Sequence, residues 1–510
     1  MVATGPVEIV WNQSRDACPG LNWAGHIGEQ PDSMPLAWHN PLTNVTSLIS
    51  ANDWGTFATV GPTLHDVRNL RHDCSHRVYS EVNSTLPWTY ANHQWLQSAQ
   101  VYPNGSGFAL IHNEFHGGMT RNASFCSGGP GTSGCQYWSA GVGVTRDGGE
   151  HWTLVDKPPM HRTFSVPRRY VKDSSTTGFG AIGAMAKQGD YYYGHIQQIS
   201  AGESASTALT GTCAWRTHDL SNPSAYRGYN GSGWHTTWID PYTDSSHGDH
   251  TCLSIDMGSA NNSHASMRTF AGDWQPHDWP SHLMLGWPEH SHSEVSYAFP
   301  AWEAGSAAPF TQWGAAQYLS IEEWTPPELR GCGEFMYPSL IDADSPFTLA
   351  EFNVNKGKTG GESAGTSAAI GLSYGLVGNE SAALYFVVSR RYIARLPVAF
   401  IAAGAPTPRP GPYPPPAKPT FNPTNCSSFL VAGAGQADVN GMYSMVRDSA
   451  TTAIPTYQKD AQHQLYHFGQ EWKLGWEGVR FYYHSARSAS MAVPMVWPAC
   501  GFTGPTVTCA

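Results

Sequence analysis

The stretch QWLQSAQVYPNGSGFALIHNEF, residues 94–115, decides the fold class of this chain. It holds two apolar runs, QWLQSAQVY (94–102) and GFALIHNEF (107–115), which are separated by a short segment of Pro, Asn, Gly and Ser. Short apolar runs bounded by turn residues predict two β-strands joined by a tight connection. The region around them shows almost no helical periodicity, so we expect an all-β fold.

Similar pairs of strands recur along the first 400 residues at intervals of roughly 70–90 residues. Four more stretches have the composition of a strand in a crowded interior: MPLAW (34–38), GFGAIGAMA (178–186), HTCLSIDMG (250–258) and MYPSLIDAD (336–344). Most are followed by a second apolar strand: YYYGHIQQI (191–199), HLMLGWPE (282–289) and ALYFVVSRR (383–391). Five units of four strands around one axis predict a five-bladed β-propeller. The alternative is one long β-sandwich, or two.

The composition excludes several other classes of protein. The chain has 53 Gly and 37 Pro in 510 residues, and only 13% of its residues are charged, which does not fit a coiled coil or a helical bundle. Its 20 Trp, 23 Tyr and 19 Phe can bury enough surface to exclude disorder. The net charge of −11 argues against nucleic acid or an anionic membrane as the main partner. No apolar run is long enough to predict a membrane span.

A proline-rich segment divides the chain. Residues 404–424 read GAPTPRPGPYPPPAKPTFNPT, a composition that predicts an extended, semi-rigid linker. We therefore expect a propeller over residues 1–403 and a small disulfide-closed β domain over 425–510, with a hairpin turn at Asn440-Gly441. Four aromatic residues of this small domain would either bind glycan or form its core: Trp472, Trp476, Tyr482 and Tyr483.

Two patterns predict a secreted glycoprotein. Asn-x-Ser/Thr acceptors for N-glycosylation occur at Asn12, Asn44, Asn83, Asn104, Asn122, Asn230, Asn261, Asn379 and Asn425. The cysteines form an even set that we expect to be disulfide-bonded: Cys18, Cys74, Cys126, Cys135, Cys213, Cys252, Cys332, Cys426, Cys500 and Cys509. Cys126 and Cys135 are the best local pair, and Cys426 is expected to pair with Cys500 or Cys509. The alternative is buried free thiols in a cytosolic enzyme. The first residues, MVATGPVEIVWN, lack the features of a signal peptide, which suggests a mature form behind an added Met.

One turn carries a resemblance to a known group. Residues 145–152, TRDGGEHW, fit the Ser/Thr-x-Asp-x-Gly-x-x-Trp pattern of the Asp-box found in sialidase-like propellers. The stretch 213–229 resembles a degenerate copy. The strand Tyr337-Pro-Ser-Leu-Ile-Asp342 is similar to the closing-blade strand of five-bladed glycosidases related to arabinanases and xylosidases. Because an Asp-box is a structural turn, Asp147 and Asp219 are poor catalytic candidates.

This resemblance implies carboxylates that project from inner strands into one axial funnel. A glycosidase needs a proton donor and a base or nucleophile, usually two carboxyl groups. Asp32, just before MPLAW, occupies the place where related five-bladed enzymes have a base. The alternative is an Asp that caps a proline-rich turn.

The second carboxylate candidate is Glu114. Strand alternation places His112, Glu114 and His116 on one face, and such polar residues in an apolar strand are costly unless they line a wet cavity. Neighbouring imidazoles would tune the carboxyl group for acid/base work. A metal site and a structural network are the alternatives, and the strand spacing is no zinc signature.

The remaining candidates precede or follow other predicted inner strands. Glu334 and Asp249 are the further acid/base candidates, and His250 would bind substrate hydroxyls. Arg390 would pair with an acidic sugar, while His93 and Trp95, together with Trp38, would stack on or hydrogen-bond to a sugar ring. The first inner strand has no Arg, which argues against a true sialidase site.

The leading interpretation is an enzyme, a secreted glycoside hydrolase that acts on an extracellular glycan. A polysaccharide lyase is a second possibility. A non-catalytic extracellular glycoprotein, lectin-like or involved in surface or filament assembly, is the alternative from a different class. We expect carbohydrate as the partner and no cofactor, although the axis leaves room for a structural cation such as calcium. Self-assembly or association with a cell surface would fit the same features.

Overall fold

The computed structural model shows an all-β protein whose only α-helix among the described residues is the four-residue α1 (Gln13–Asp16). The structure describes residues 1–19, 29–52, 55–79, 86–89, 93–120, 124–127, 135–157, 161–172, 176–183, 185–188, 190–200, 209–238, 241–242, 252–255, 284–286, 294–298, 306–309, 311–314, 317–326, 329, 335–343, 382–399, 420–421, 428–432, 440–446, 456–460, 463–468, 471–476, 480–484, 493–494 and 506–509. Short 3-10 helices lie at Val67–Asn69, Pro87–Thr89, Gly117–Met119, Pro223–Ala225 and Glu322–Trp324.

The first sheet is antiparallel, and its strands are neighbours in chain order: β3 (Leu36–Asn40), β4 (Val45–Ile49), β5 (Ala58–Gly61) and β6 (Arg71–Asp73). A left-handed Asn44, with φ of 58°, closes the turn between β3 and β4. Asn is one of the few non-glycine residues that adopt this conformation readily. The sequence therefore builds a meander here from local turns alone.

The next strands form two antiparallel groups. The first group is β7 (His93–Val101), β8 (Gly107–His116) and β9 (Gln136–Thr145), with β10 (Thr153–Leu154) and β11 (Arg162–Phe164) on its outer edge. The second group is β12 (Thr177–Ile182), β14 (Tyr191–Ser200), β15 (Leu209–Thr217) and β16 (Arg227–Gly228), with β13 (Ala186–Gln188) and β17 (Ser254–Ile255). A short parallel contact between β12 and β9 joins them into one sheet. The strand pair expected over 94–115 is thus confirmed.

Two further sheets follow. One contains β18 (Met284–Gly286), β19 (Glu294–Ala298) and β20 (Gln317–Ser320). The other contains β21 (Phe335–Asp342), β22 (Ala382–Val388) and β23 (Tyr392–Ala399), and is completed by β1 (Val2–Ala3) and β2 (Glu8–Asn12). The N-terminal strands therefore pair with strands almost 400 residues away, which ties the two ends of this region together.

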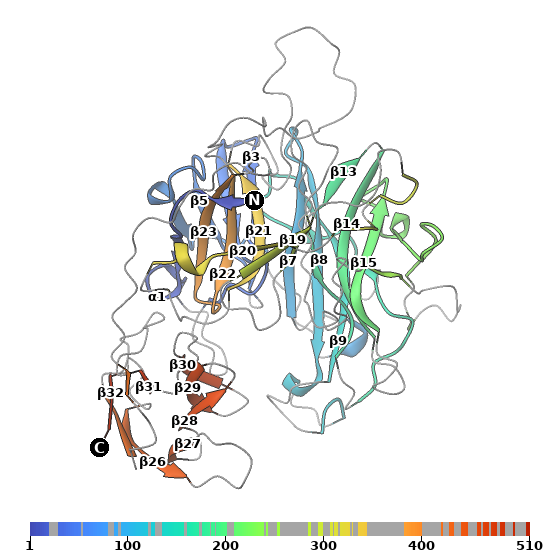
Figure 1. Cartoon of the computed structure of the whole chain (residues 1–510). Helices are drawn as coiled ribbons and strands as arrows, with labels where there is room; N and C mark the ends of the chain where they lie inside the picture. Colours follow the sequence, from blue (N-terminus) through green and yellow to red (C-terminus); the bar gives the residue numbers. More distant parts are fainter. Residues whose placement is uncertain are drawn as a thin grey trace.

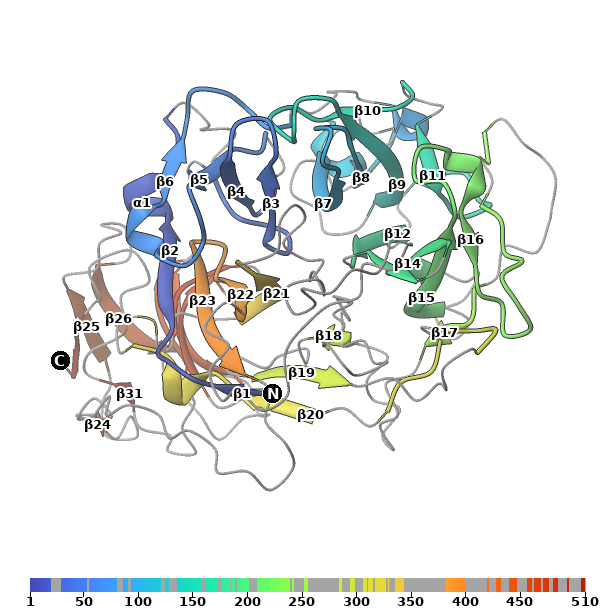
Figure 2. The same ribbon diagram turned by 90° about the horizontal axis from the view of Figure 1, so that it is seen from above.

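Seen from above, these sheets surround a central region (Figure 2). The strands β3, β7, β12, β18 and β21 lie nearest the centre, and later strands of each group lie farther out. Below this ring in Figure 1 lies a separate seven-stranded sheet of β25 (Ser428–Ala432), β26 (Gly441–Val446), β27 (Thr456–Asp460), β28 (His463–Phe468), β29 (Glu471–Trp476), β30 (Arg480–His484) and β32 (Thr506–Cys509). The pair β24 (Thr420–Phe421) and β31 (Val493–Pro494) lies beside it.

One expected inner strand has a different place. The stretch 250–258 was expected to line the centre, but its strand β17 pairs with β15, with Ser254 opposite Cys213. Because β14 occupies the other edge of β15, β17 lies on the outer side of its group. The disulfide between Cys213 and Cys252 gives the physical reason, since it fixes the chain beside β15.

The core lies between neighbouring sheets, where aromatic side chains pack face to edge. The turn 145–152 shows how: Trp152 is buried against Trp38 of β3, with ring centroids 5.9 Å apart. The Thr145 hydroxyl donates to Asp147 Oδ1 at 2.7 Å, and the Trp152 indole donates to the Gly149 carbonyl at 3.1 Å. A Cβ on Gly149 would lie 2.2 Å from Trp38, so only glycine fits. This turn joins the sheet of β3 to β6 to the group of β7 to β9, and Asp147 has a structural role in it.

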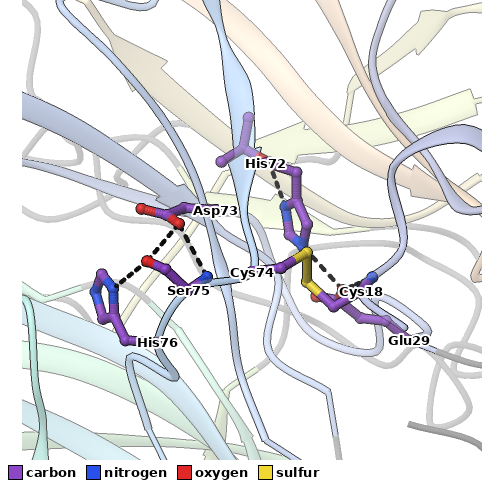
Figure 3. Close-up of a disulfide and its surroundings, with 8 residues drawn as sticks. Cys18, Glu29, His72, Asp73, Cys74, Ser75 and His76 are labelled. Atoms are coloured by element: carbon purple, nitrogen blue, oxygen red, sulfur yellow. Dashed lines mark hydrogen bonds and ion pairs between the residues drawn. A yellow bond between two sulfur atoms is a disulfide. The ribbon is translucent and has the colours of Figure 1, made fainter. Parts of the chain in front are cut away.

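Three disulfides link described cysteines: Cys18–Cys74, Cys126–Cys135 and Cys213–Cys252. The local pair expected from the sequence is confirmed. The side chains of Cys332, Cys426, Cys500 and Cys509 lie outside the described part. In Figure 3, His72 lies beside the Cys18–Cys74 bond and contacts Glu29 at 2.9 Å. Disulfides of this kind indicate an oxidising environment.

No helix in the described residues is long and apolar enough to cross a membrane.

Candidate functional site

The pairing of β7 with β8 gathers four titratable or aromatic residues on one face. His93 lies opposite Glu114, and Trp95 lies opposite His112. Alternation along β8 adds His116 to the same face. All of these residues lie where β7 begins and β8 ends, so the sequence pattern His-x-Glu-x-His becomes a single cluster at one end of an inner strand pair.

Glu114 is the centre of this cluster. Nε2–H of His116 donates a hydrogen bond to one carboxylate oxygen, and Nε2 of His112 lies 3.4 Å from the other. Burial by itself raises the pKa of Glu114, but the imidazoles of His112, His116 and His93 together bring that pKa below its ordinary value. The site therefore holds Glu114 as a buried carboxylate at neutral pH.

The tautomer of His112 follows from the contact of its other ring nitrogen, Nδ1, with Gln97. The backbone N–H of Ile182 donates to Oε1 of Gln97 at 2.7 Å, which leaves the amide NH2 group facing Nδ1 of His112 at 3.5 Å. Nδ1 is thus the acceptor, and the proton of the neutral ring lies on Nε2, toward Glu114. Burial, and secondarily the charge of His116, lowers the pKa of His112 to about 4, although Glu114 opposes the shift. His112 is consequently neutral at physiological pH.

The strand β12 closes one side of the cluster. A Cβ on Gly180 would lie 2.7 Å from Nε2 of His112 and 2.6 Å from the ring of Trp138. The backbone of β12 can therefore approach His112 this closely only because residue 180 is glycine. The same strand supplies the Ile182 amide that orients Gln97, so it both packs against and orients the imidazole.

The cluster opens toward solvent at His116. His93 and His112 are 2% and 4% exposed, whereas the His116 side chain is 17% exposed. The rings of His93 and His116 stack with centroids 4.1 Å apart. Trp95 is 5% exposed and packs beside His93 and His112 in the core, so it presents little surface to a ligand. His116 is thus the most exposed imidazole of the cluster.

The geometry suits proton transfer better than metal binding. The two imidazoles contact different oxygens of Glu114, so the carboxylate lies between them and their nitrogens do not converge on one point. Within the described residues, the groups close enough to share an ion lie elsewhere. Cys18, His72 and Cys74 form one, but its cysteines are disulfide-bonded, and Asp147, Glu150 and His151 form the other on the structural turn.

Asp32 lies in a second polar cluster. The hydroxyl of Tyr337 donates to Oδ1 of Asp32 at 2.7 Å, and Nε of Arg390 lies 3.0 Å from the same oxygen. Tyr337, Ser389 and Arg390 all have positive φ, between 52° and 59°. Such backbone costs energy in residues other than glycine and is concentrated at functional sites. The structure thus brings two predicted residues, Asp32 and Arg390, into direct contact, and it adds Tyr337, which the sequence analysis named only as part of a strand motif.

A small apolar cluster connects these two polar clusters. Met34, Ala181, Met336, Tyr337 and Val387 pack together in the core. Tyr337 hydrogen-bonds Asp32, while Ala181 follows the glycine that packs on His112. The groups that begin with β3, β12 and β21 therefore meet here, and Figure 2 shows these three strands near the centre.

The other predicted residues lie outside the described part of the chain. These are Asp249, His250 and Glu334. Sequence reasoning missed Gln97 and Tyr337, which orient His112 and Asp32. A polar residue in the apolar run 94–102 and a tyrosine at the start of an inner strand were the available signals, but each is common in β-strands.

Comparisons with known proteins show a likeness to solved structures at low sequence identity. No family model and no curated protein matches it. Among solved structures, the chain is similar to an α-L-arabinofuranosidase from Fusarium graminearum, with 10% identity, a TM-score of 0.30, and 63% of this chain and 71% of that one covered. It is also similar to a sucrose-6-phosphate hydrolase from Lactobacillus gasseri, with 9% identity, a TM-score of 0.38 and coverage of 95% and 81%. A β-fructofuranosidase from Bombyx mori matches with 10% identity, a TM-score of 0.32 and coverage of 98% and 94%. These values are too low to assign an activity to this chain.

Proposed function

We propose that residues 1–403 form a five-bladed β-propeller, followed by a proline-rich linker over 404–424 and a small β domain over 425–510. Two observations support the propeller. The strands nearest the centre in Figure 2 are the first strands of successive groups. The N-terminal strands β1 and β2 pair with β23, which would close the ring by completing the last blade.

We propose that the protein is a secreted glycoside hydrolase that acts on an extracellular glycan by carboxylate catalysis. The observation that carries this proposal is the buried carboxylate of Glu114, which is held between His112 and His116 at one end of the β7–β8 pair and has a lowered pKa. A carboxylate that is kept charged in a largely buried site suits a base or nucleophile. The partly exposed His116 would give substrate access to it.

The roles follow from the state of each carboxylate. Glu114 is assigned as the base or nucleophile because its pKa is lowered. Asp32 is paired with Arg390 and Tyr337, so it is assigned to stabilise positive charge that develops on the sugar ring. The proton donor is then assigned to Glu334, because the strand that follows Asp249 lies on the outer side of its group.

A Glu114→Gln variant tests the central role. We expect its turnover on a panel of plant, fungal and bacterial polysaccharides, measured as release of reducing ends, to fall by about 100-fold or more. Glu323→Gln, an exposed matched control, should keep wild-type turnover. Equal thermal unfolding temperatures for both variants would show that folding is intact. Wild-type turnover in Glu114→Gln would refute the assignment.

Substrates with different leaving groups test the proton donor. An aryl glycoside with an acidic phenol as leaving group needs no protonation, so it should restore most of the activity of the Glu334→Gln variant, which removes the donor. It should not restore Glu114→Gln. If the loss of activity in Glu334→Gln is the same for all leaving groups, the donor is another residue.

Tyr337→Phe tests the role of Asp32, because it removes only the hydroxyl that donates to that carboxylate. We expect kcat/KM to fall about tenfold, the usual size of one hydrogen bond to a charged group. Unchanged kcat/KM would remove Asp32 from the site.

The pairing of both carboxylates favours one other function. Asp32 and Glu114 each have a cationic or imidazole partner, which would also fit a lectin-like protein that binds glycan without turnover. Binding of a polysaccharide with no release of reducing ends would support this alternative. Products that absorb in the ultraviolet would instead show a lyase, which leaves an unsaturated sugar.

Secretion and N-glycosylation belong to the same proposal. Asn44 and Asn104 are exposed at turns, and Asn12 and Asn230 are half-buried. In Asn104 and Asn230 the side-chain oxygen accepts a hydrogen bond from the hydroxyl of the serine two residues later. Mass spectrometry after enzymatic removal of N-glycans from the secreted protein would identify the occupied sites. Acceptor asparagines that are all unmodified would contradict this part.

A further inference from the structure

An aromatic pair formed by an exposed tryptophan and a half-buried tyrosine lies just before strand β7 in the structure. Trp88, on the 3-10 helix Pro87–Thr89 just before β7, is 40% exposed. Its ring lies 6.3 Å from that of Tyr242 at an angle of 59°. Exposed patches of apolar or aromatic surface often mark binding sites. Indole and phenol rings pack well against the apolar faces of sugar rings.

Two arginines pack against the tyrosine of this pair. The guanidinium groups of Arg162 and Arg169 lie 5.9 Å and 5.7 Å from the centroid of the Tyr242 ring, and Nε of Arg169 donates to the Pro241 carbonyl at 3.1 Å. We call Trp88, Arg162, Arg169 and Tyr242 the Trp88 platform. Stacking on an aromatic ring holds a guanidinium group in place. Arg169 is exposed and can also reach a ligand at the surface, whereas Arg162 is half-buried behind it.

The local charge is opposite to that of the whole chain. Residues 157–172 hold five Lys or Arg and no Asp or Glu, although the net charge of the protein is −11. Arg169 and Lys172 are exposed. A cationic segment on an acidic protein concentrates anions at one place on the surface. The ligand of this platform should therefore carry negative charge.

Two connections tie the platform to the candidate site. The Tyr170 amide donates to the Tyr242 hydroxyl at 2.8 Å, and the Tyr170 ring packs 5.1 Å from that of Phe115, the neighbour of Glu114. Trp88 also lies five residues before His93, whose ring stacks on His116. Because side chains alternate along a strand, Phe115 and Glu114 lie on opposite faces of β8, so these contacts reach β8 from the face opposite to the Glu114 carboxylate.

We propose that the Trp88 platform binds an anionic sugar residue of a polysaccharide. Trp88 stacks on the sugar ring, and Arg169 pairs with its carboxylate or sulfate group, while Arg162 adds positive charge behind it. This proposal names the substrate class of the proposed function. It rests on that function only in taking the bound polysaccharide to be the polymer that is hydrolysed. Binding itself is independent of turnover.

Binding to three polymers tests the proposal: polygalacturonate, which carries carboxylates, dextran sulfate, which carries sulfates, and neutral dextran. We expect the full-length protein to bind at least one of the two acidic polymers in isothermal titration calorimetry and not to bind dextran. Affinity for a carboxylate or a sulfate polymer alone would identify which acidic group is recognised. Because exposed charges are screened by salt, affinity should fall as NaCl rises from about 0.05 M to about 0.5 M.

Matched variants locate the binding surface. Trp88→Ala should weaken binding about tenfold, the size of a central aromatic contact, and Arg169→Gln about two- to fivefold. Tyr318→Ala and Arg68→Gln are the controls, because both side chains are exposed elsewhere and should leave binding unchanged. Glu114→Gln should bind as the wild type does, which separates failure of the platform from failure of the catalytic assignment.

Several results would overturn the proposal. Equal affinity for dextran and for the acidic polymers would show that binding does not require negative charge on the ligand. Wild-type affinity in both Trp88→Ala and Arg169→Gln would place any binding elsewhere. A third result has two parts: equimolar single-stranded DNA displaces the acidic polymer, and Trp88→Ala binds that polymer as tightly as the wild type does. This result would show a general surface for polyanions and no sugar site.

Discussion

Replacement of His112 by Gln is expected to change how the stability of the protein depends on pH. The buried imidazole has a pKa of about 4 in the folded protein, against an ordinary value of 6.5. Because the folded pKa is depressed, the unfolded chain binds the extra proton between these two values. The stabilisation that depends on a neutral His112 is therefore complete above about pH 6.5 and is lost as the pH falls toward 4.

The size of the effect follows from the shift. One proton taken up on unfolding changes the free energy of unfolding by about 1.4 kcal/mol for each pH unit, and the full interval amounts to about 3 kcal/mol. His161 adds a slope of the same sign, because its burial, with a smaller effect of Arg162, lowers its pKa to about 3. As the pH falls, the free energy of unfolding of the wild type should thus decrease with a slope that corresponds to about two protons from these residues. In His112→Gln the slope should correspond to about one proton.

Urea unfolding followed by tryptophan fluorescence at several pH values from about 7 to about 5 measures this slope. In this range the ordinary titrations of Asp and Glu contribute little. The variant will be less stable at pH 7, because it loses the contact with Glu114, but only the slope tests the reasoning. His65→Gln, at an exposed histidine, serves as the control and should keep the wild-type slope. A wild-type slope in His112→Gln would show that His112 is not held neutral.

Other perturbations test the packing of the fold. Trp152→Ala should lower the free energy of unfolding by about 3–5 kcal/mol, because it empties a buried site against Trp38, and a loss below about 1 kcal/mol in urea unfolding would contradict the packing role of this turn. Replacing both cysteines of Cys213–Cys252 by serine should cost about 4 kcal/mol, and replacing those of Cys126–Cys135 about 2.6 kcal/mol, since the first disulfide closes a loop of 39 residues and the second a loop of 9. The reverse order in thermal or urea unfolding would exclude loop entropy as the main contribution.

The strands could be predicted because their signals are local. The runs at 94–102 and 107–115 became β7 and β8, since a turn of Pro, Asn and Gly leaves few other conformations for such neighbours. The run 250–258 was misplaced for the opposite reason. Its position depends on a disulfide to Cys213, 39 residues earlier in the chain, and sequence spacing alone does not determine such a pairing.

The candidate site shows the same division. Alternation along one strand predicted that His112, Glu114 and His116 share a face, and the register of β7 added His93. The protonation of these groups could not be predicted, because a pKa depends on burial and on neighbours from other strands. Gln97, oriented by a backbone amide of β12, fixes the tautomer of His112, and Gly180 allows that strand to approach.

The sequence by itself determined an all-β chain, the local strand pairs, the Cys126–Cys135 disulfide and the polar face of β8. Each of these depends on residues close together in the chain, where backbone preference and side-chain alternation act directly. Only the tertiary structure decided that Tyr337 and Arg390 hold Asp32, that Trp88 and Tyr242 pair beside arginines, and that Glu114 is held ionised. Those features bring together residues between about 70 and 360 positions apart, or depend on burial by such residues, and long-range packing alone fixes their distances.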